Sequence, residues 1–340
     1  MFGLSMTVGI DLGTANTRVY VKGKGIVIRE PTVIALDAET RKIMAVGKNA
    51  RMMIGRTPGS ILAVRPLKDG VIANYEMTEE MLRYFLNLTR SRRILMKPKV
   101  IVCIPSGVTG IHKRAILEAA SEAGSRQTFL MEEPMAAAIG AGLNIWEPSG
   151  TMVVDIGGGT TDIAVISLGG IVTADSCTVG GDRFDEAIIR YVRQEHNLTI
   201  GERTAEDVKI QIGSVDPRAN TGTAEIKGRD FVTGLPKSID FSSGEVCRAI
   251  SEPFYEIINN VKSVLERTPP ELASDIVEKG IVCTGGGALL NGFTMLMSEE
   301  IRVPVHVAED PMNCVIIGAS KAFESPEIFR NSLVPGPKFM

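Results

Sequence analysis

Apolar residues along this chain recur with two different periods, and the period changes repeatedly from one segment to the next. Continuous apolar runs such as 100–104 predict buried strands, whereas apolar residues three and four positions apart predict helices with one buried face. The helix expected to begin at Thr78 shows this second spacing in Met81, Phe85 and Leu88. Strands that alternate with turns and helices are typical of a mixed sheet covered by helices, so an α/β fold is expected.

Further segments have the spacing of helices. Pro134 suits a first helical turn, where its missing N–H costs no hydrogen bond, and so marks a helix start after Glu132 and Glu133. Segment 217–243 is polar and glycine-rich and predicts a small inserted subdomain. The additional helices are expected at 113–123, 134–140, 184–195 and 245–267.

One pattern occurs twice, near the N-terminus and in the middle of the chain. In each copy an apolar strand ends in an aspartate, a turn of glycine and threonine follows, and a second apolar run begins a hairpin. The copies are 9–17, Gly-Ile-Asp-Leu-Gly-Thr-Ala-Asn-Thr, and 154–162, Val-Asp-Ile-Gly-Gly-Gly-Thr-Thr-Asp. Two matched copies predict two homologous halves that hold one ligand between them.

The chemistry of these turns suits phosphate. Glycine lets the backbone bend so that its N–H groups approach an anion, and small hydroxyls add further donors. An aspartate beside an anion needs an intervening cation, and Mg²⁺ accepts carboxylates, water and phosphate oxygens together, so Asp11 and Asp155 are predicted to face magnesium through water. Either turn alone would fit an ordinary hairpin equally well, but the duplication favours phosphate. A third glycine turn, at 285–287 after the strand 280–284, is another candidate nucleotide contact.

Length and composition exclude several other classes of protein. A chain of 340 residues, 44% of them hydrophobic, suits two lobes with separate cores. Its 37 basic and 40 acidic residues are interspersed and leave a net charge of −3, so nucleic acid is not an expected partner. The five cysteines form no Cys-x-x-Cys pair and the three histidines lie far apart, so reduced core cysteines are expected, and neither a zinc site nor a histidine triad.

No signal peptide and no apolar run long enough to span a bilayer are present, so a cytosolic protein is expected unless the chain docks on a membrane. The candidate for docking is 92–97, Arg-Arg-Ile-Leu-Met-Lys, because apolar residues flanked by cations suit shallow insertion among anionic headgroups. Segment 1–4 is a weaker candidate. The alternative for 92–97 is a helix end with basic residues near its carbonyls, followed by the start of the next strand.

With the doubled Asp-x-Gly turns, the Glu133-Pro134 helix start and the segment 283–287, Cys-Thr-Gly-Gly-Gly, in this order, the chain resembles the actin-like ATPases. Within them it is similar to the MreB/Mbl family of bacterial actins, over nearly its whole length. The resemblance implies a slow ATPase that polymerises into filaments, expected to be paired, on the inner face of the cytoplasmic membrane. It also implies work with the cell-wall elongation machinery, organising lateral wall synthesis to maintain rod shape.

The fold implied by this resemblance is actin-like, with a duplicated ribonuclease H-like core. Two domains are expected, each a mixed sheet flanked by helices, with the nucleotide in the cleft between them. Domain I is expected to comprise 1–145 and 315–340, with a small outer subdomain at about 33–65. Domain II is expected at 146–314, with a small outer subdomain at about 183–244.

The family's site residues carry over to this chain position by position, for ATP with Mg²⁺. The two turns are implied to hold the phosphates through Asp11, Gly13, Thr14, Ala15 and Asn16 in the first copy and Asp155, Gly157, Gly158, Gly159 and Thr160 in the second. The adenosine is expected beside Glu206, Asp207, Val208 and Lys209 on one side and Gly286, Gly287, Ala288 and Leu289 on the other. The membrane contact is expected to be made by Ile94, Leu95 and Met96.

For hydrolysis, the resemblance implies that Glu133 orients or deprotonates the attacking water, with Thr161 as a helper. This suits phosphoryl transfer, which depends mainly on positioning and on neutralising charge. The alternative is that Glu133 only complements the positive end of its helix, and that the neighbouring Glu132 acts instead.

Two positions depart from the family pattern, His112 and Asn74, and both lie outside the phosphate turns. The main alternative function is a chaperone-like ATPase that switches conformation without polymerising, which would be expected to carry a further client-binding domain. A small-molecule kinase would need a catalytic aspartate at a sugar hydroxyl, and no independent segment offers one. A scaffold that binds ATP without turnover also stays open.

Overall fold

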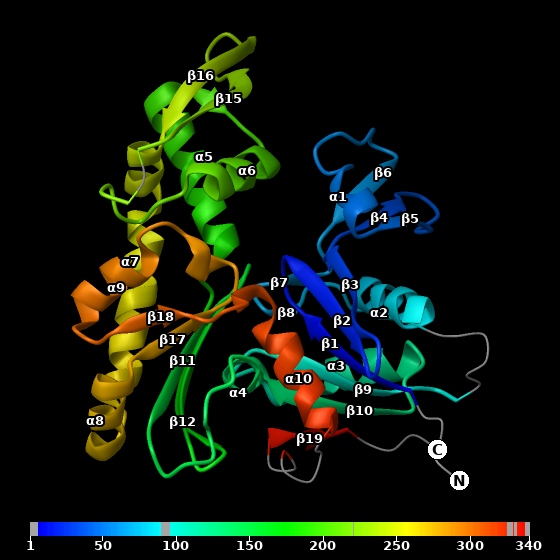
Figure 1. Cartoon of the computed structure of the whole chain (residues 1–340). Helices are drawn as coiled ribbons and strands as arrows, with labels where there is room; N and C mark the ends of the chain where they lie inside the picture. The colour runs from blue at the N-terminus through cyan, green and yellow to red at the C-terminus, as the bar shows by residue number, and fades with distance from the viewer. Residues whose placement is uncertain (1–5, 90–95, 220, 325–328, 330–331, 337–340) are drawn as a thin grey trace.

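The computed structural model describes residues 6–89, 96–219, 221–324, 329 and 332–336. In this part of the chain two large sheets stand side by side, each with a smaller sheet beyond it at the same end of the molecule (Figure 1). A layer of two helices, α4 (Glu133–Gly140) and α10 (Cys314–Glu324), lies between the large sheets.

The first large sheet has the strand order β19-β10-β9-β1-β2-β3. Strands β1, β2 and β3 form an antiparallel meander, β9 pairs in parallel with β1, and β10 pairs in parallel with β9. Helices α2 (Tyr75–Thr89) and α3 (Gly110–Glu122) cover one face through buried side chains such as Met81, Phe85 and Ile116. The strands are β1 (Thr7–Leu12), β2 (Asn16–Val21), β3 (Gly25–Pro31), β9 (Lys99–Ile104), β10 (Gln127–Glu132) and β19 (Val334–Pro335).

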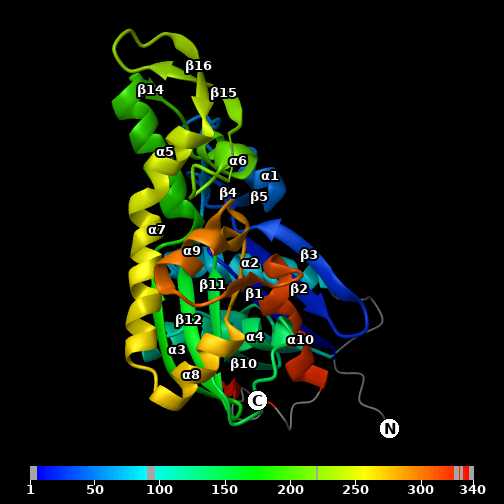
Figure 2. The ribbon, with the colours of Figure 1, turned by 60° about the vertical axis from the view of Figure 1, so that its left-hand side comes forward.

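The second large sheet repeats this plan in the order β13-β12-β11-β17-β18. Here β11, β12 and β13 form the antiparallel meander, β17 pairs in parallel with β11, and β18 pairs in parallel with β17. Its outer face packs on α7 (Ser243–Glu266), which runs along the whole second half (Figure 2), and on α8 (Pro270–Lys279) and α9 (Phe293–Ile301). The strands are β11 (Thr151–Ile156), β12 (Thr161–Ser167), β13 (Gly170–Cys177), β17 (Ile281–Thr284) and β18 (Val305–Val307).

Two small sheets lie beyond the large ones. The first, in the order β5-β4-β6, carries α1 (Lys48–Arg51), and the second, in the order β14-β15-β16, lies beside α5 (Gly181–His196) and α6 (Glu202–Ile212). They fall within 33–65 and 183–244, the ranges given above for the outer subdomains, while the domain boundaries themselves stay predictions. The strands are β4 (Ile34–Asp37), β5 (Ile43–Val46), β6 (Ile61–Val64), β14 (Leu198–Thr199), β15 (Thr223–Asp230) and β16 (Pro236–Ser242), and a short hairpin joins β7 (Leu67–Lys68) to β8 (Val71–Ile72).

Small residues allow α4 and α10 to pack closely between the sheets. A Cβ atom at Gly140 would collide with the backbone of Cys314, and one at Gly318 would collide with the backbone of Ala136. Because the helices touch through their backbones, they hold the two sheets near each other at the point where β1 and β11 end.

Several helices begin earlier than the sequence predicted: α2 at Tyr75 rather than Thr78, α3 at 110 rather than 113, and α5 at 181 rather than 184. Helix α2 begins at Tyr75, three residues before Thr78, because the Asn74 side chain accepts a hydrogen bond from the Met77 N–H at 3.0 Å and caps the helix. The Thr78 hydroxyl is buried in the first turn and donates to the Asn74 carbonyl at 2.8 Å. After β17 the chain forms a single turn of 3₁₀-helix, η1 (Gly287–Leu289), before α9 begins.

Candidate functional site

A cavity of about 320 Å³ lies between the two halves, where β1 and β11 end. Its wall includes both glycine turns, the third glycine turn after β17, and residues of α4, α5 and α6. Its volume is typical of a small-molecule site.

The two glycine turns face each other directly across this cavity. A Cβ atom at Gly158 would collide with Ala15, and one at Gly159 would collide with Thr14. Only glycine therefore permits this approach, which brings the backbone of the second turn against the first. Such an arrangement presents N–H groups from both halves to one ligand.

Each turn is held by hydrogen bonds from neighbouring segments. In the first, the Thr32 hydroxyl donates to the Gly13 carbonyl at 2.7 Å, and the Gly70 N–H donates to the Thr14 hydroxyl at 3.0 Å. In the second, the Gly181 N–H donates to the Gly157 carbonyl at 3.0 Å and the Asp182 N–H to the Gly158 carbonyl at 2.8 Å. The start of α5 thus supports the second turn.

The two aspartates predicted to face magnesium are both buried beside the cavity, but their partners differ. Asp11 accepts a hydrogen bond from Arg18 at 3.3 Å, whereas Asp155 accepts one from the Thr284 hydroxyl at 2.6 Å. Burial raises the pKa of Asp11, against the opposing effect of Arg18, and raises that of Asp155 to about 7. The ionised form of a carboxyl group buried in this way is stable only when a cation lies beside it.

Glu133 lines the cavity at the start of α4 and is only 8% exposed. Burial raises its pKa well above the usual value, and the nearby Asp162, Asp11 and Asp155 carboxylates raise it further. Glu132 points elsewhere, because it pairs with Lys113 at 3.7 Å and accepts a hydrogen bond from the Ser106 hydroxyl at 3.4 Å. Of the two glutamates, the structure places Glu133 in the cavity.

Thr161 does not lie in the cavity wall. Its hydroxyl is fully buried and donates to the Val179 carbonyl at 2.7 Å, because the first residue of β12 turns its side chain toward β13 and the loop beyond it. The preceding Thr160 does line the cavity.

The wall expected beside the adenosine contains only some of the expected residues. Glu206, Lys209, Gly286, Gly287 and Leu289 line the cavity. Val208 and Ala288 are buried in the hydrophobic core behind the wall, and Asp207 lines a neighbouring cavity. The side chains of α6 alternate between cavity and core because of the helical period.

The Lys209 side chain is held by two partners on α5. Its ammonium donates to the Gly181 carbonyl at 2.7 Å and to Asp185 at 2.9 Å. Burial raises the pKa of Asp185 to about 7, although Lys209 opposes this shift. Lys209 thereby ties α6 to the start of α5, beneath the second turn.

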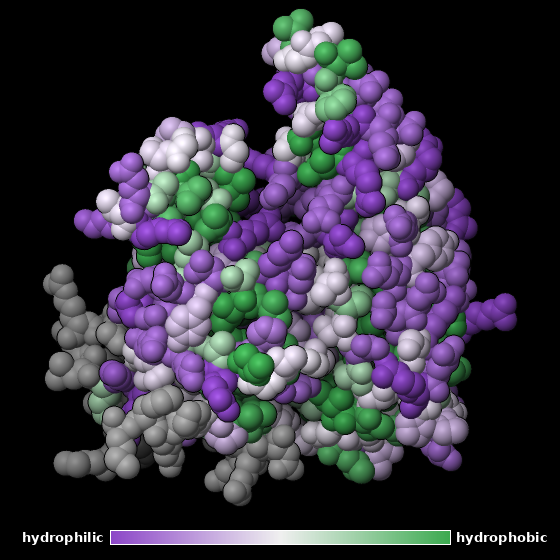
Figure 3. Space-filling model, turned by 180° about the vertical axis from the view of Figure 1, so that it is seen from behind, coloured by the Kyte–Doolittle hydropathy of each residue, from purple (hydrophilic) through white to green (hydrophobic). Residues whose placement is uncertain are grey.

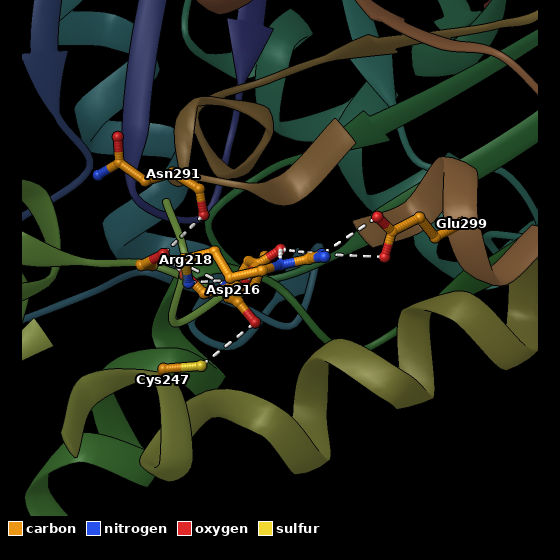
Figure 4. A network of polar contacts seen from close by, with 7 residues as sticks. Asp216, Arg218, Cys247, Asn291 and Glu299 are labelled. Atoms are coloured by element: carbon orange, nitrogen blue, oxygen red, sulfur yellow. Dashed lines mark hydrogen bonds and ion pairs between the residues drawn. The ribbon is translucent and has the colours of Figure 1, made fainter. Parts of the chain in front are cut away.

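A polar network ties the loop after α6 to Asn291, to Cys247 of α7 and to Glu299 of α9 (Figure 4). The Asn291 amide donates to the Gly213 carbonyl at 2.7 Å, and the Cys247 thiol donates to the Val215 carbonyl at 3.2 Å. Arg218 contacts both Asp216 and Glu299, at 2.6 and 3.0 Å. Because Gly213 and Asn291 both line the cavity, their hydrogen bond joins two parts of its wall.

Ion pairs connect the two halves at the rim of the cavity. Arg65, just after β6, pairs with Asp182 of α5 at 2.7 Å and lies 3.7 Å from Glu202. Arg51 of α1 pairs with Glu206 of α6. These contacts join segments more than a hundred positions apart, and spacing along the sequence gave no signal for them.

Two residues of the hairpins were also missed, the half-buried Arg18 and the buried Asp162. Asp162 is fully buried on β12 and accepts the Ser106 N–H at 2.6 Å, and burial raises its pKa to about 6. The hairpin register was the available signal, because β2 pairs Arg18 with Asp11 and β12 pairs Asp162 with Asp155. Residues opposite each other in antiparallel strands share a face.

No group of three or more His, Cys, Asp or Glu side chains in the described ranges could hold a metal ion by itself. Asp11 and Asp155, with raised pKa values and oxygen donors, fit a hard cation such as Mg²⁺ that takes its other ligands from water and phosphate.

The expected membrane residues Ile94 and Leu95, and segment 1–4, lie outside the described residues. Met96 is described and is 43% exposed. None of the helices in the described ranges has the length and apolar character to cross a bilayer. Of the two departures from the family pattern, Asn74 caps α2, and His112 is half-buried on the first turn of α3; neither lines the cavity.

Two sheets of the same plan, with a glycine turn from each at one cavity, define an actin-like protein. The crystal structure of MreB 5 of Spiroplasma citri bound to AMPPNP superposes with a TM-score of 0.91 at 41% identity, covering 96% of this chain and 98% of the other. A MamK double helical filament shares the fold, with a TM-score of 0.81 at 24% identity over 94% of this chain and 99% of the other.

The sequence comparisons identify the family. The family model described as MreB/Mbl protein matches residues 5–331, so the chain belongs to this family. The cell shape-determining protein Mbl of Bacillus cereus is 53% identical over 94% of this chain and 96% of its own length. The cell shape-determining protein MreB of Escherichia coli is 51% identical over 94% of each chain.

Proposed function

We propose that this protein binds and slowly hydrolyses ATP with Mg²⁺, polymerises into filaments on the inner face of the cytoplasmic membrane, and organises lateral cell-wall synthesis in rod-shaped cells. The observation that carries the nucleotide part is the direct apposition of the two glycine turns at one cavity. The AMPPNP and ADP bound to MreB 5 of Spiroplasma citri support the choice of nucleotide. The cell-shape part is supported by the names of the Mbl and MreB relatives.

In this proposal the N–H groups of the two turns hold the β- and γ-phosphates from both sides. Asp11 and Asp155 would hold Mg²⁺ through water, and the ion would supply neutralisation of the phosphate charge. Glu206, Lys209 and the third glycine turn would flank the adenosine. One ligand would thus contact both halves of the chain.

Glu133 is the residue proposed to orient the attacking water and to accept its proton. It projects from a helix start into the cavity, and its raised pKa makes its carboxylate a better base than an ordinary glutamate. The role expected for Thr161 stays a prediction, and it would require the hydroxyl to leave the Val179 carbonyl.

Nucleotide binding is proposed to favour the closed arrangement of the halves, in which Arg65 and Arg51 bridge the rim. Loss of the terminal phosphate would weaken the link between the turns and so reduce the population of this arrangement. Filament assembly is proposed to depend on it, because the Arg51–Glu206 pair links the two outer subdomains.

The outer subdomains also present apolar surface suited to assembly. At the tip of the β15–β16 hairpin Phe231, Val232 and Leu235 are exposed, and the tip stands clear of the molecule as an apolar patch (Figure 3). Exposed apolar patches of this kind commonly mark protein contacts. Membrane binding is proposed for 92–97 on the grounds of its apolar residues and flanking cations.

Electron microscopy of the purified protein with anionic lipid vesicles, with and without Mg-ATP, tests this proposal, together with phosphate release from the same samples. We expect filaments on the vesicles and slow phosphate release only with Mg-ATP. A variant in which 94–96 become serine should still form filaments but lose the vesicles. ATP-dependent conformational change without filaments at any concentration would favour the chaperone-like alternative, and filaments without phosphate release would favour the scaffold alternative.

A further inference from the structure

Arg18 occupies an unusual place beside the phosphate turns. It lies on β2 directly opposite Asp11, and its Nη1 donates to Asp11 Oδ2 at 3.3 Å. The side chains of Arg18 and Asp11 are only 14% and 9% exposed. This contact is long and uses one of the five guanidinium N–H donors, so in the described structure most of the donor capacity of Arg18 is not used by side-chain acceptors.

Acidic side chains predominate over basic ones in the wall of the cavity proposed to bind the nucleotide, so a cation beside the two turns would stabilise a bound polyphosphate. Among the described residues that line the cavity, six are carboxylic acids and two are cations, Arg18 and Lys209. Lys209 is committed to Asp185 and to the Gly181 carbonyl. Arg18 is therefore the available cation beside the two turns, where a polyphosphate would bring further negative charge.

Arg18 also has space in which to change its position. It lines a second cavity of about 570 Å³, adjoining the first, whose wall contains the additional cations Arg29, Lys48, Arg51 and Arg203. The guanidinium thus stands at the boundary between the two cavities. A planar fork of donors on a long side chain can exchange one oxyanion partner for another.

We propose that Arg18 is a nucleotide-contacting residue that releases Asp11 and binds the terminal phosphate of a bound nucleoside triphosphate, and so determines the preference for triphosphate over diphosphate. The release leaves Asp11 available to the magnesium side of the site. This inference rests on the proposed nucleotide binding, but it concerns a residue outside the glycine turns.

Equilibrium binding of AMPPNP and ADP, each with Mg²⁺, to the wild-type chain and to Arg18→Gln, Arg18→Lys and Arg29→Gln tests the inference. Arg29 is the matched control, because it is the cross-strand neighbour of Arg18 on β3 and lines only the second cavity. We expect Arg18→Gln to weaken AMPPNP binding about tenfold or more and ADP binding much less, since a charged hydrogen bond to phosphate is lost. Arg18→Lys should retain part of the preference, and Arg29→Gln should retain all of it.

The possible outcomes separate the inference from the function on which it rests. Equal AMPPNP and ADP losses in Arg18→Gln, or the same loss in Arg29→Gln, would show that Arg18 acts only through the general field and would overturn the inference. Unchanged AMPPNP binding in Arg18→Gln would do the same. A wild-type chain that binds neither nucleotide would instead overturn the proposed function. Should Arg18→Gln fail to fold, a wild-type AMPPNP preference in Arg18→Lys, which cannot form the planar fork, would overturn the inference.

Discussion

The hairpins β1–β2 and β11–β12 have the same backbone plan, but the residues opposite their aspartates carry opposite charges. In the first, Asp11 faces Arg18 across the strands, and in the second, Asp155 faces Asp162. The first hairpin therefore carries a neutralised pair, whereas the second carries two buried carboxyls. The two hairpins thus share the glycine turns, whose shape depends on the backbone, but differ in the side chains opposite the aspartates.

Because of this difference, the second hairpin has the stronger influence on the pKa of Glu133, the proposed base. After burial itself, Asp162 is the strongest influence that raises the pKa of Glu133. Asp162 also accepts the Ser106 N–H from the loop after β9, so it joins the second hairpin to the first half of the molecule. The second hairpin thus raises the pKa of the proposed base, and the first carries the cation that we propose to meet the phosphates.

The largest expected effect tests whether Glu133 carries this chemistry. Glu133→Gln should slow ATP hydrolysis about 100-fold or more while leaving AMPPNP affinity near the wild-type value, because a neutral amide cannot accept the proton. Phosphate release under single-turnover conditions measures it. Glu132→Gln is the control, since Glu132 pairs with Lys113 outside the cavity. A hydrolysis rate in Glu133→Gln equal to that of the control would contradict the assignment.

The opposite charges of the hairpins should give opposite effects on stability. Arg18→Gln leaves the buried Asp11 without its ion pair and should lower the free energy of unfolding by about 1–3 kcal/mol. Asp162→Asn removes a buried like charge, keeps an oxygen for the Ser106 N–H, and should raise the stability at pH 8. Thermal unfolding without nucleotide measures both. Shifts of the same sign in the two variants would show that the charge difference between the hairpins does not govern stability.

A smaller effect should appear in the pH dependence of the nucleotide-free protein. Burial raises the pKa of Asp155 to about 7 and that of Asp162 to about 6, from an ordinary value of 3.8. Because the folded values exceed the unfolded ones, the stability these groups contribute is complete below about pH 4 and is lost as the pH rises through 6 and 7. The melting temperature should therefore fall between pH 5 and pH 8.

Asp155→Asn distinguishes this cause from others, because the amide stays neutral at every pH. The variant should melt above the wild type at pH 8, and its slope between pH 5 and pH 8 should be smaller. Asp11→Asn should change the slope less, since Arg18 opposes the rise in the pKa of Asp11. If the melting temperature of Asp155→Asn changed with pH as steeply as that of the wild type, the second hairpin would not be the source of the pH dependence.

The smallest expected effect concerns the rim that joins the two hairpins' halves. Arg65→Gln removes the contact with Asp182, whose N–H supports the second turn, and should speed nucleotide release by a few-fold, because partly exposed ion pairs contribute on the order of 1 kcal/mol or less. Stopped-flow displacement of a fluorescent nucleotide measures the rate. Arg183→Gln, next along the chain from Asp182 and paired with Glu186 within α5, is the control and should release nucleotide like the wild type.

Much of this architecture could be predicted from local patterns. Each glycine turn follows an apolar strand and precedes a hairpin, so the sequence alone predicted both cradles and their duplication, and the order of strands and helices predicted the mixed sheets. The start of α2 was misplaced because Asn74 and Thr78 are both residue types that favour a helix start, and only the hydrogen bond to Met77 distinguishes them. Val208 and Ala288 were expected beside the adenosine but lie in the hydrophobic core, because the spacing of residues along the chain does not tell which face of a segment is turned to the core.

What the sequence by itself determined is therefore the chemistry available at each turn, namely glycine, hydroxyl and carboxylate in a repeated order that suits a magnesium-bound phosphate. The tertiary structure alone decided how these parts meet: Gly158 against Ala15, Arg65 against Asp182, and Glu133 rather than Glu132 in the cavity. The physical reason is that conformational preferences act over a few neighbouring residues, whereas burial and charge pairing depend on contacts between segments far apart in the chain.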